Sequence, residues 1–160
     1  MTNFMHKKYA MFGGVVGFYY CIQFVACVAA CNFFSDISRY NSCTMGDVVI
    51  TGDEASDVFD TAIRLAGVFH VIEWVRATIL LTVVCIGVNL MQVWYVTAVT
   101  ALYGIAVFIY VMVVVGSDKG QACSEAQNTR YMWLIVEIIY FWVFFFINQV
   151  PFALTFLFSK

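Results

Sequence analysis

Three long apolar runs, separated by two polar loops, restrict the folds open to this chain. Residues 9–34 contain no charged side chain, residues 61–116 contain four ionisable groups, and residues 131–157 contain one acid. A helix of about 20 mostly apolar residues crosses the roughly 30 Å hydrocarbon core of a bilayer. The runs are unbroken and do not alternate at every second residue, which favours helices over a transmembrane barrel. We therefore expect an all-α integral membrane protein.

The run at 61–116 is about twice the length of one span, so we expect two helices joined by a tight turn. Its cluster of helix-weakening and polar residues is Gly87, Asn89 and Gln92, which places the turn at about 88–92. A surface helix at 59–76 would leave about 40 apolar residues, which is too many for one span and few for two. The prediction is a single domain, residues 1–160, with four transmembrane helices at about 9–34, 62–88, 93–115 and 131–157.

Lysine and arginine near the ends of the spans predict the orientation, because they are retained on the cytoplasmic side. Lys7 and Lys8 precede the first span without an acid, and Lys160 ends the sequence. The loop at 35–60 has one arginine against six acidic residues. We therefore expect both termini on the same side, cytoplasmic or matrix-like, with the loops at 35–60 and 117–130 on the opposite side.

The second span carries four ionisable side chains where water is scarce. Arg64, His70, Glu73 and Arg76 lie roughly 5, 14, 18 and 23 Å from its outer edge, at about 1.5 Å per residue. Arg64 can turn outward and meet Asp60, four residues earlier. Glu73 is three residues from both His70 and Arg76, so we predict that it bridges them within one helix. This pairing would reduce a cost of about 2.5–3.5 kcal/mol for each unpaired charge.

The last span offers polar groups at similar depths. Glu137 lies roughly 9 Å deep, and Asn148 lies roughly 26 Å deep. The other two spans contribute uncharged polar groups, among them Gln23, Thr97 and several tyrosines. We therefore expect the second and fourth helices to face each other across a buried polar network, which consists of Arg64, His70, Glu73, Arg76, Glu137 and Asn148.

Two interpretations of this network stay open. One is a self-satisfied structural feature that fixes helix register or pairs with another protein. The other is a proton or ion pathway, or a haem or quinone pocket, since ionisable groups inside a membrane often mark a functional site. A b-type haem with two histidine ligands needs a second chain, because His70 is the only histidine in the spans. His70 is therefore the candidate ligand for a haem b or quinone shared with another subunit.

The cysteines in the loops differ from those in the spans. Cys43 and Cys123 are the only two in the loops expected to share a side, so a disulfide between them would tie the first loop to the last if that side is oxidising. Two free thiols are the alternative. Cys27 and Cys31 are one helical turn apart, but no second ligand pair with zinc spacing accompanies them, so no metal site is expected.

Small residues along the first span predict close helix packing. Gly13, Gly17 and Cys21 recur every four residues, and Ala26 and Ala30 repeat the spacing. In lipid, such stripes let two helix backbones approach closely. The helix that packs there belongs either to this bundle or to a neighbouring subunit, and lipids are expected to cover the remaining apolar surface.

The motifs of soluble enzymes are missing from the sequence, including a Gly-rich phosphate loop, HExxH and CxxC. The net charge of −2 gives no indication of a nucleic-acid partner. The leading hypothesis is a non-enzymatic accessory or structural subunit of a larger membrane protein complex, with other integral membrane subunits as its partners. Respiratory-chain complexes are rich in such subunits. The absence of Asn-x-Ser/Thr sequons favours the mitochondrial inner membrane over secretory or plasma membranes.

The layout of four spans, internal termini, a tiny inner turn and cysteine-bearing outer loops resembles the MARVEL tetraspan proteins of vesicles and junctions. The resemblance covers the topology of most of the chain, and AIRLAGVF at residues 62–69 is similar in character. It implies a membrane-organising role and transfers no site residue. The alternatives to an accessory subunit are therefore a MARVEL-like organiser, and a haem, quinone or proton-pathway subunit built on His70, Glu73 and Arg76.

Overall fold

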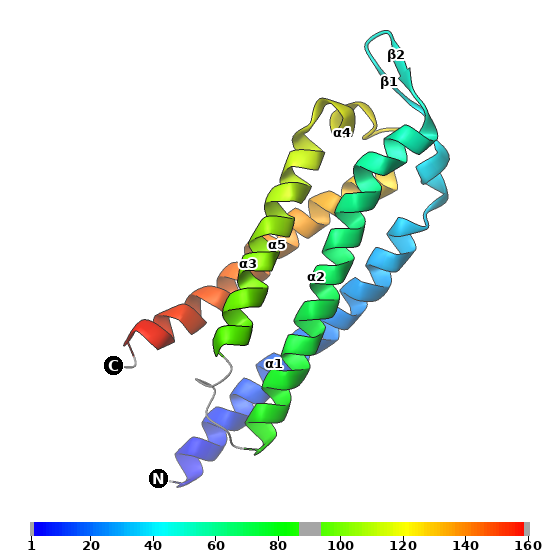
Figure 1. Cartoon of the computed structure of the whole chain (residues 1–160). Helices are drawn as coiled ribbons and strands as arrows, with labels where there is room; N and C mark the ends of the chain where they lie inside the picture. The colour runs from blue at the N-terminus through cyan, green and yellow to red at the C-terminus, as the bar shows by residue number, and fades with distance from the viewer. Residues whose placement is uncertain (1, 87–93, 159–160) are drawn as a thin grey trace.

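The computed structural model describes the backbone of residues 2–86 and 94–158, and the side chains of residues 14, 17–83, 85–86 and 97–143. In these residues, four long helices form an elongated bundle, and a hairpin and a short helix lie at one end (Figure 1). The elements in chain order are α1 (Thr2–Phe34), the 3-10 helix η1 (Ile37–Tyr40), β1 (Cys43–Met45), β2 (Val48–Ile50), α2 (Gly52–Ile86), α3 (Trp94–Gly116), α4 (Asp118–Ala122) and α5 (Asn128–Phe158). The prediction of a mostly helical chain is confirmed.

Three stretches with described side chains are long and apolar enough to cross a membrane: Gly17–Tyr40, Gly52–Val83 and Thr97–Gly116. Valines and isoleucines cover the outward faces of these helices, while histidine, glutamate and arginine lie inside. This arrangement is the reverse of a soluble bundle and indicates a membrane protein. The run at 131–157 lies in α5, where the described side chains end before residue 144.

The start of α2 differs from the prediction, because the helix begins at Gly52 and the predicted start was 62. Thr51 and Glu54 form a capping box, in which the Thr51 hydroxyl accepts from the backbone N–H of Glu54 and the Glu54 carboxylate accepts from the N–H of Thr51, both at 3.4 Å. The acidic residues at 53–60, which the prediction placed at the end of the first loop, therefore form the first turns of α2. The predicted turn at 88–92 lies outside the described residues.

The first loop departs from the all-α prediction, because it contains an antiparallel hairpin. β1 and β2 pair Cys43 with Ile50 and Met45 with Val48. Gly46, in the two-residue turn, has a φ of 62°, which glycine adopts without steric cost. Two short β-prone segments around a Gly-Asp pair were the available sequence signal for this hairpin.

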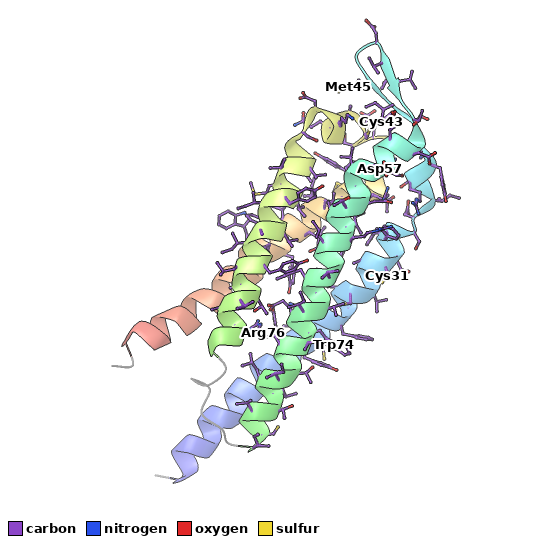
Figure 2. The ribbon with its side chains drawn as sticks, viewed as in Figure 1. Cys31, Cys43, Met45, Asp57, Trp74 and Arg76 are labelled. Carbon is purple, nitrogen blue, oxygen red and sulfur yellow. A yellow bond between two sulfur atoms is a disulfide. The ribbon has the colours of Figure 1, made fainter. Side chains whose placement is uncertain are left out.

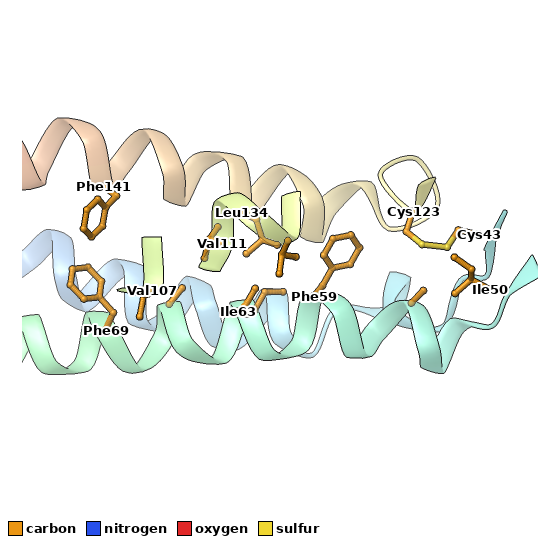
Figure 3. Close-up of a cluster of buried hydrophobic side chains, with 14 residues drawn as sticks. Cys43, Ile50, Phe59, Ile63, Phe69, Val107, Val111, Cys123, Leu134 and Phe141 are labelled. Atoms are coloured by element: carbon orange, nitrogen blue, oxygen red, sulfur yellow. A yellow bond between two sulfur atoms is a disulfide. The ribbon is translucent and has the colours of Figure 1, made fainter. Parts of the chain in front are cut away.

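α2 is the central helix of the bundle and contacts α1, α3 and α5. Gly104 of α3 allows a close approach, since a Cβ there would lie 2.7 Å from the ring of Phe69. Figure 3 shows how buried side chains from α2, α3 and α5 interleave along this axis. They include Phe59, Ile63, Phe69, Val107, Val111, Leu134 and Phe141. This packing determines which face of each of the three helices points inward, and it thereby positions the polar side chains on those faces.

The small residues of α1 divide into a part that packs inside the bundle and a part that does not. Ala30 of α1 is buried against α2, where a Cβ added to Gly67 would lie 3.5 Å from the Ala30 methyl group. A Cβ at Gly17 would meet nothing within 4 Å, and Cys21 is exposed. Gly13 lies outside the described side chains. The Gly17–Cys21 part of the stripe therefore packs against no helix of the described bundle.

Candidate functional site

Seven polar side chains from three helices meet inside the bundle. Their spacings of three or four residues place them on one face of each helix. Six of the seven are buried, and Tyr140 is half-buried. α1 supplies Tyr19 and Gln23, α2 supplies His70, Glu73 and Arg76, and α5 supplies Glu137 and Tyr140. Figure 2 shows Arg76 on the part of α2 that lies away from the hairpin.

Glu73 and Arg76 form an ion pair at the inner end of this cluster. Both Glu73 carboxylate oxygens accept from Arg76 Nε at 3.0 Å, and Oε2 also accepts from Nη2 at 2.5 Å. The Tyr19 hydroxyl donates to the same Oε2 at 2.5 Å. The Arg76 guanidinium lies 5.6 Å from the centre of the Tyr19 ring. The pair therefore neutralises its charge within the chain and retains a third partner on α1.

His70 is fully buried and has a partner at each ring nitrogen. Nδ1 lies 2.7 Å from Gln23 Oε1, and Nε2 lies 2.9 and 3.0 Å from the two carboxylate oxygens of Glu137. Because an amide oxygen only accepts, His70 Nδ1 carries a proton in this arrangement. The contact with Glu137 then holds one further proton, either on Nε2 as an imidazolium or on the carboxyl group. Both forms are neutral as a pair.

Two tyrosines connect these pairs. Gln23 Nε2 donates to the Tyr140 hydroxyl, and the Tyr140 and Tyr19 side chains interact with each other. A series of polar contacts therefore runs from Glu137 through His70, Gln23 and the two tyrosines to the Glu73–Arg76 pair.

Of the predicted bridge of Glu73 between His70 and Arg76, the contact with Arg76 is present and the contact with His70 is not. Glu73 binds Arg76 and Tyr19, while His70 binds Glu137 and Gln23. His70 and Arg76 both lie at allowed helical spacing from Glu73, and the packing of α1 and α5 decides between them. Asn148, the predicted partner at the inner end, lies outside the described side chains.

Arg64 is also placed differently from the prediction of a buried network. It is exposed, and its guanidinium lies 4.6 Å from the centre of the Phe34 ring. Asp60, its predicted partner, accepts from Arg130 and from Arg39 Nη2, the latter at 3.2 Å. Since two other arginines hold Asp60, Arg64 packs over an aromatic ring at the surface of the bundle.

A second polar cluster lies at the hairpin end, around Arg130. This arginine has no exposed surface and donates to Asp60, to Gln127 Oε1 at 2.9 Å and to Ser56 Oγ at 3.3 Å. Gln127 Nε2 in turn donates to the backbone oxygen of Arg39 at 3.1 Å. In the sequence, Arg130 is the last residue of the polar loop at 117–130 and gives no sign of burial. The cluster fastens η1 to both α2 and α5.

A disulfide joins Cys43 of β1 to Cys123, the residue after α4, with the two Cα atoms 5.1 Å apart (Figure 3). These are the two cysteines that the loop positions indicated. Cys27 and Cys31 are free thiols, as are Cys21 and Cys85. The disulfide links the hairpin to the connection between α3 and α5 and so holds the two outer loops together.

The chemistry open to the buried cluster is proton exchange and charge pairing. Axial ligation of a haem iron by His70 would require one of its two ring contacts to break. Among the described side chains, no group of three or more histidines, cysteines and acids is arranged to hold a metal ion. Comparison with protein-family models, with curated proteins and with solved structures returns no match.

Proposed function

We propose that the chain is a four-span membrane protein that acts as a non-enzymatic structural subunit of a larger membrane protein complex. The observation that carries this proposal is the uncovered small-residue face of α1. The positions of Gly14 and Gly17 are open beyond the helix, and Cys21 is exposed. Small residues at such a face let a second backbone approach, and close packing is the main force between helices in lipid.

An apolar groove continues this face toward the outer end. It is formed by α1 and α5 and has no polar lining. Its lining residues are Cys21, Ile22, Val25, Ala26, Ala29 and Trp133. A helix of another integral membrane subunit that crosses α1 at Gly17 would find continuous apolar surface there. Lipids would cover the remaining outward valines and isoleucines.

The proposed topology uses residues 131–157 as the fourth span, with both termini on the cytoplasmic or matrix-like side. The lysines of the N-terminal tail and the acidic first loop support this orientation. The Cys43–Cys123 disulfide supports an oxidising compartment for both outer loops. We favour the mitochondrial inner membrane and a respiratory-chain complex, since sequons are absent. A MARVEL-like organiser of secretory membranes is the alternative.

The replacement Gly17→Leu tests this proposal. We expect the variant to lose its partners, because a leucine side chain would occupy the space that a neighbouring backbone needs. The measurement is the apparent mass of the tagged chain in mild detergent, together with quantitative mass spectrometry of the proteins that co-purify.

Gly116→Leu is the matched control, because Gly116 is equally open but lies at the end of α3. It should retain the complex, and both variants should unfold at the wild-type temperature. A complex that survives Gly17→Leu, or a wild-type chain that purifies as a stable monomer, would contradict the proposal.

Proton movement through the buried cluster is the second candidate function. It is favoured by the series of polar contacts between the His70–Glu137 and Glu73–Arg76 pairs. From His70 to Arg76 this series covers about 9 Å along the helix axis, at about 1.5 Å per residue. That is roughly a third of a 30 Å hydrocarbon core. Because the cluster spans only part of the membrane, we rank the role of a structural subunit above that of a proton pathway.

Tyr140→Phe tests the second candidate, because it removes the hydroxyl between Gln23 and Tyr19 while keeping the ring. If the cluster conducts protons, we expect proton flux into proteoliposomes to fall at least about tenfold, the effect of a barrier about 1.4 kcal/mol higher. Tyr103→Phe is the control, since the Tyr103 hydroxyl donates to the Leu65 carbonyl at 3.4 Å, outside the cluster. Equal flux in both variants and wild type would eliminate the pathway.

A further inference from the structure

The β1–β2 hairpin carries an exposed apolar tip. Met45, Val48 and Val49 have 37%, 59% and 65% of their surface exposed. Figure 1 shows the hairpin extending past the start of α2 and past α4, away from the bundle. Met45 and Val48 pair across the two strands on one face of the hairpin, and Val49 lies on the opposite face. Such a tip adds nothing to the core, and exposed apolar side chains gathered in one place mark contact sites more often than scattered ones do. We call these three residues the hairpin surface.

The hairpin is held in place from its base. Cys43 and Ile50 are buried, and Cys43 is bonded to Cys123 beside α4. The Gly46 turn adopts a conformation suited to a two-residue hairpin. A surface fixed in this way loses little conformational freedom when it binds, which favours affinity.

Exposed acidic side chains lie in the turn of the hairpin and in the first turns of α2, which follows β2 directly. Asp47 in the turn is exposed, as are Asp53, Glu54 and Asp57 in the first turns of α2. Figure 2 shows Met45 and Asp57 on the same end of the molecule. Arg39 and Arg130 at this end are already paired with Asp60, and Lys119 of α4 is an exposed cation against these four acids. The rim of the hairpin surface therefore has a strong negative excess.

We propose that the hairpin surface binds a basic, extended segment of another protein, in which apolar residues alternate with lysine or arginine. Alternation places the apolar side chains on one face and the cations on the other. β1 packs against α4, so the edge of β2 is available for an added strand, a common mode of peptide recognition. A second copy of this chain would set the same acids against each other. Anionic lipid headgroups would be repelled.

This contact is separate from the proposed helix contact on α1, and it is tested separately. The probe is a short fluorescent peptide that alternates arginine and valine, titrated against the purified full chain in neutral detergent at low salt. We expect saturable binding by anisotropy. The double variant Val48→Ser/Val49→Ser should weaken binding at least about tenfold, which corresponds to about 1.4 kcal/mol. The triple variant Asp53→Asn/Glu54→Gln/Asp57→Asn should do the same and should lose the salt dependence.

Two controls separate this site from unspecific charge attraction. Glu125→Gln removes an exposed acid after α4 and should leave binding unchanged. A peptide with serine in place of valine should bind weakly. Every variant must retain the Cys43–Cys123 disulfide, seen as a mobility shift on reduction. The proposal is overturned if the serine variant binds as tightly as wild type, if Glu125→Gln weakens binding equally, or if the hairpins of two copies cross-link through Val49→Cys in place of peptide binding.

Discussion

The replacement Arg130→Met is expected to lower the free energy of unfolding by about 3–5 kcal/mol, the usual cost of breaking a buried ion pair by removing one partner. Arg130 is completely buried and contacts Asp60, Gln127 and Ser56. Without its guanidinium, Asp60 retains only the half-exposed contact with Arg39, which is 3.2 Å away. The side-chain oxygen of Gln127, Oε1, would also lose the Arg130 guanidinium as its donor. The outer ends of α2 and α5 should therefore separate first on heating.

Arg64→Met is the matched control for this prediction. Arg64 lies one helical turn after Asp60 on α2, but it is exposed and contacts the ring of Phe34. An exposed cation over an aromatic ring contributes about 0.5–1 kcal/mol. Thermal unfolding of both variants in the same detergent makes the comparison. Equal losses of stability would show that the buried cluster around Arg130 does not hold the outer end together.

The sequence predicted the helical runs well because span length and apolar content are properties of single segments. The predicted spans at 93–115 and 131–157 match α3 and α5 within three residues, and the span at 9–34 ends with α1, which begins earlier, at Thr2. The sequence-based prediction failed where a polar segment forms local structure of its own, as at the start of α2. The capping box at Thr51 and Glu54 starts α2 early, and this extension brings Ser56 and Asp60 beside α5. Arg130 could not be recognised as a buried group without that extension.

The membership of the buried cluster was partly predictable, and its pairing was not. An acid in a span needs a partner, so His70, Glu73, Arg76 and Glu137 could be selected by residue type alone. Helical spacing allows Glu73 to reach either His70 or Arg76, and which of them it contacts depends on which face of α1 is turned inward. Tyr19 and the neutral Gln23 give no comparable sequence signal, since tyrosine and glutamine occur in spans without such a role.

A double-mutant cycle on Glu73 and Arg76 is expected to show strong coupling. Glu73→Leu leaves the Arg76 guanidinium, 5% exposed, without a counter-charge inside the bundle. Arg76→Leu leaves the Glu73 carboxylate, 1% exposed, in the same position. Each single replacement should cost about 3–5 kcal/mol of unfolding free energy.

The double replacement should cost less than either single one, because two leucines bury no charge and a hydrophobic substitute for a buried ion pair is often nearly neutral. A residual cost of about 1–3 kcal/mol is expected from the Tyr19 hydroxyl, which loses its acceptor. Adding Tyr19→Phe to the double variant should remove most of that residual cost in unfolding free energy. Additive losses from the two single replacements would mean that the pair contributes no coupling energy. In that case, the contact between α1 and α2 would depend on the packing of Ala30 against Gly67 and not on the polar cluster.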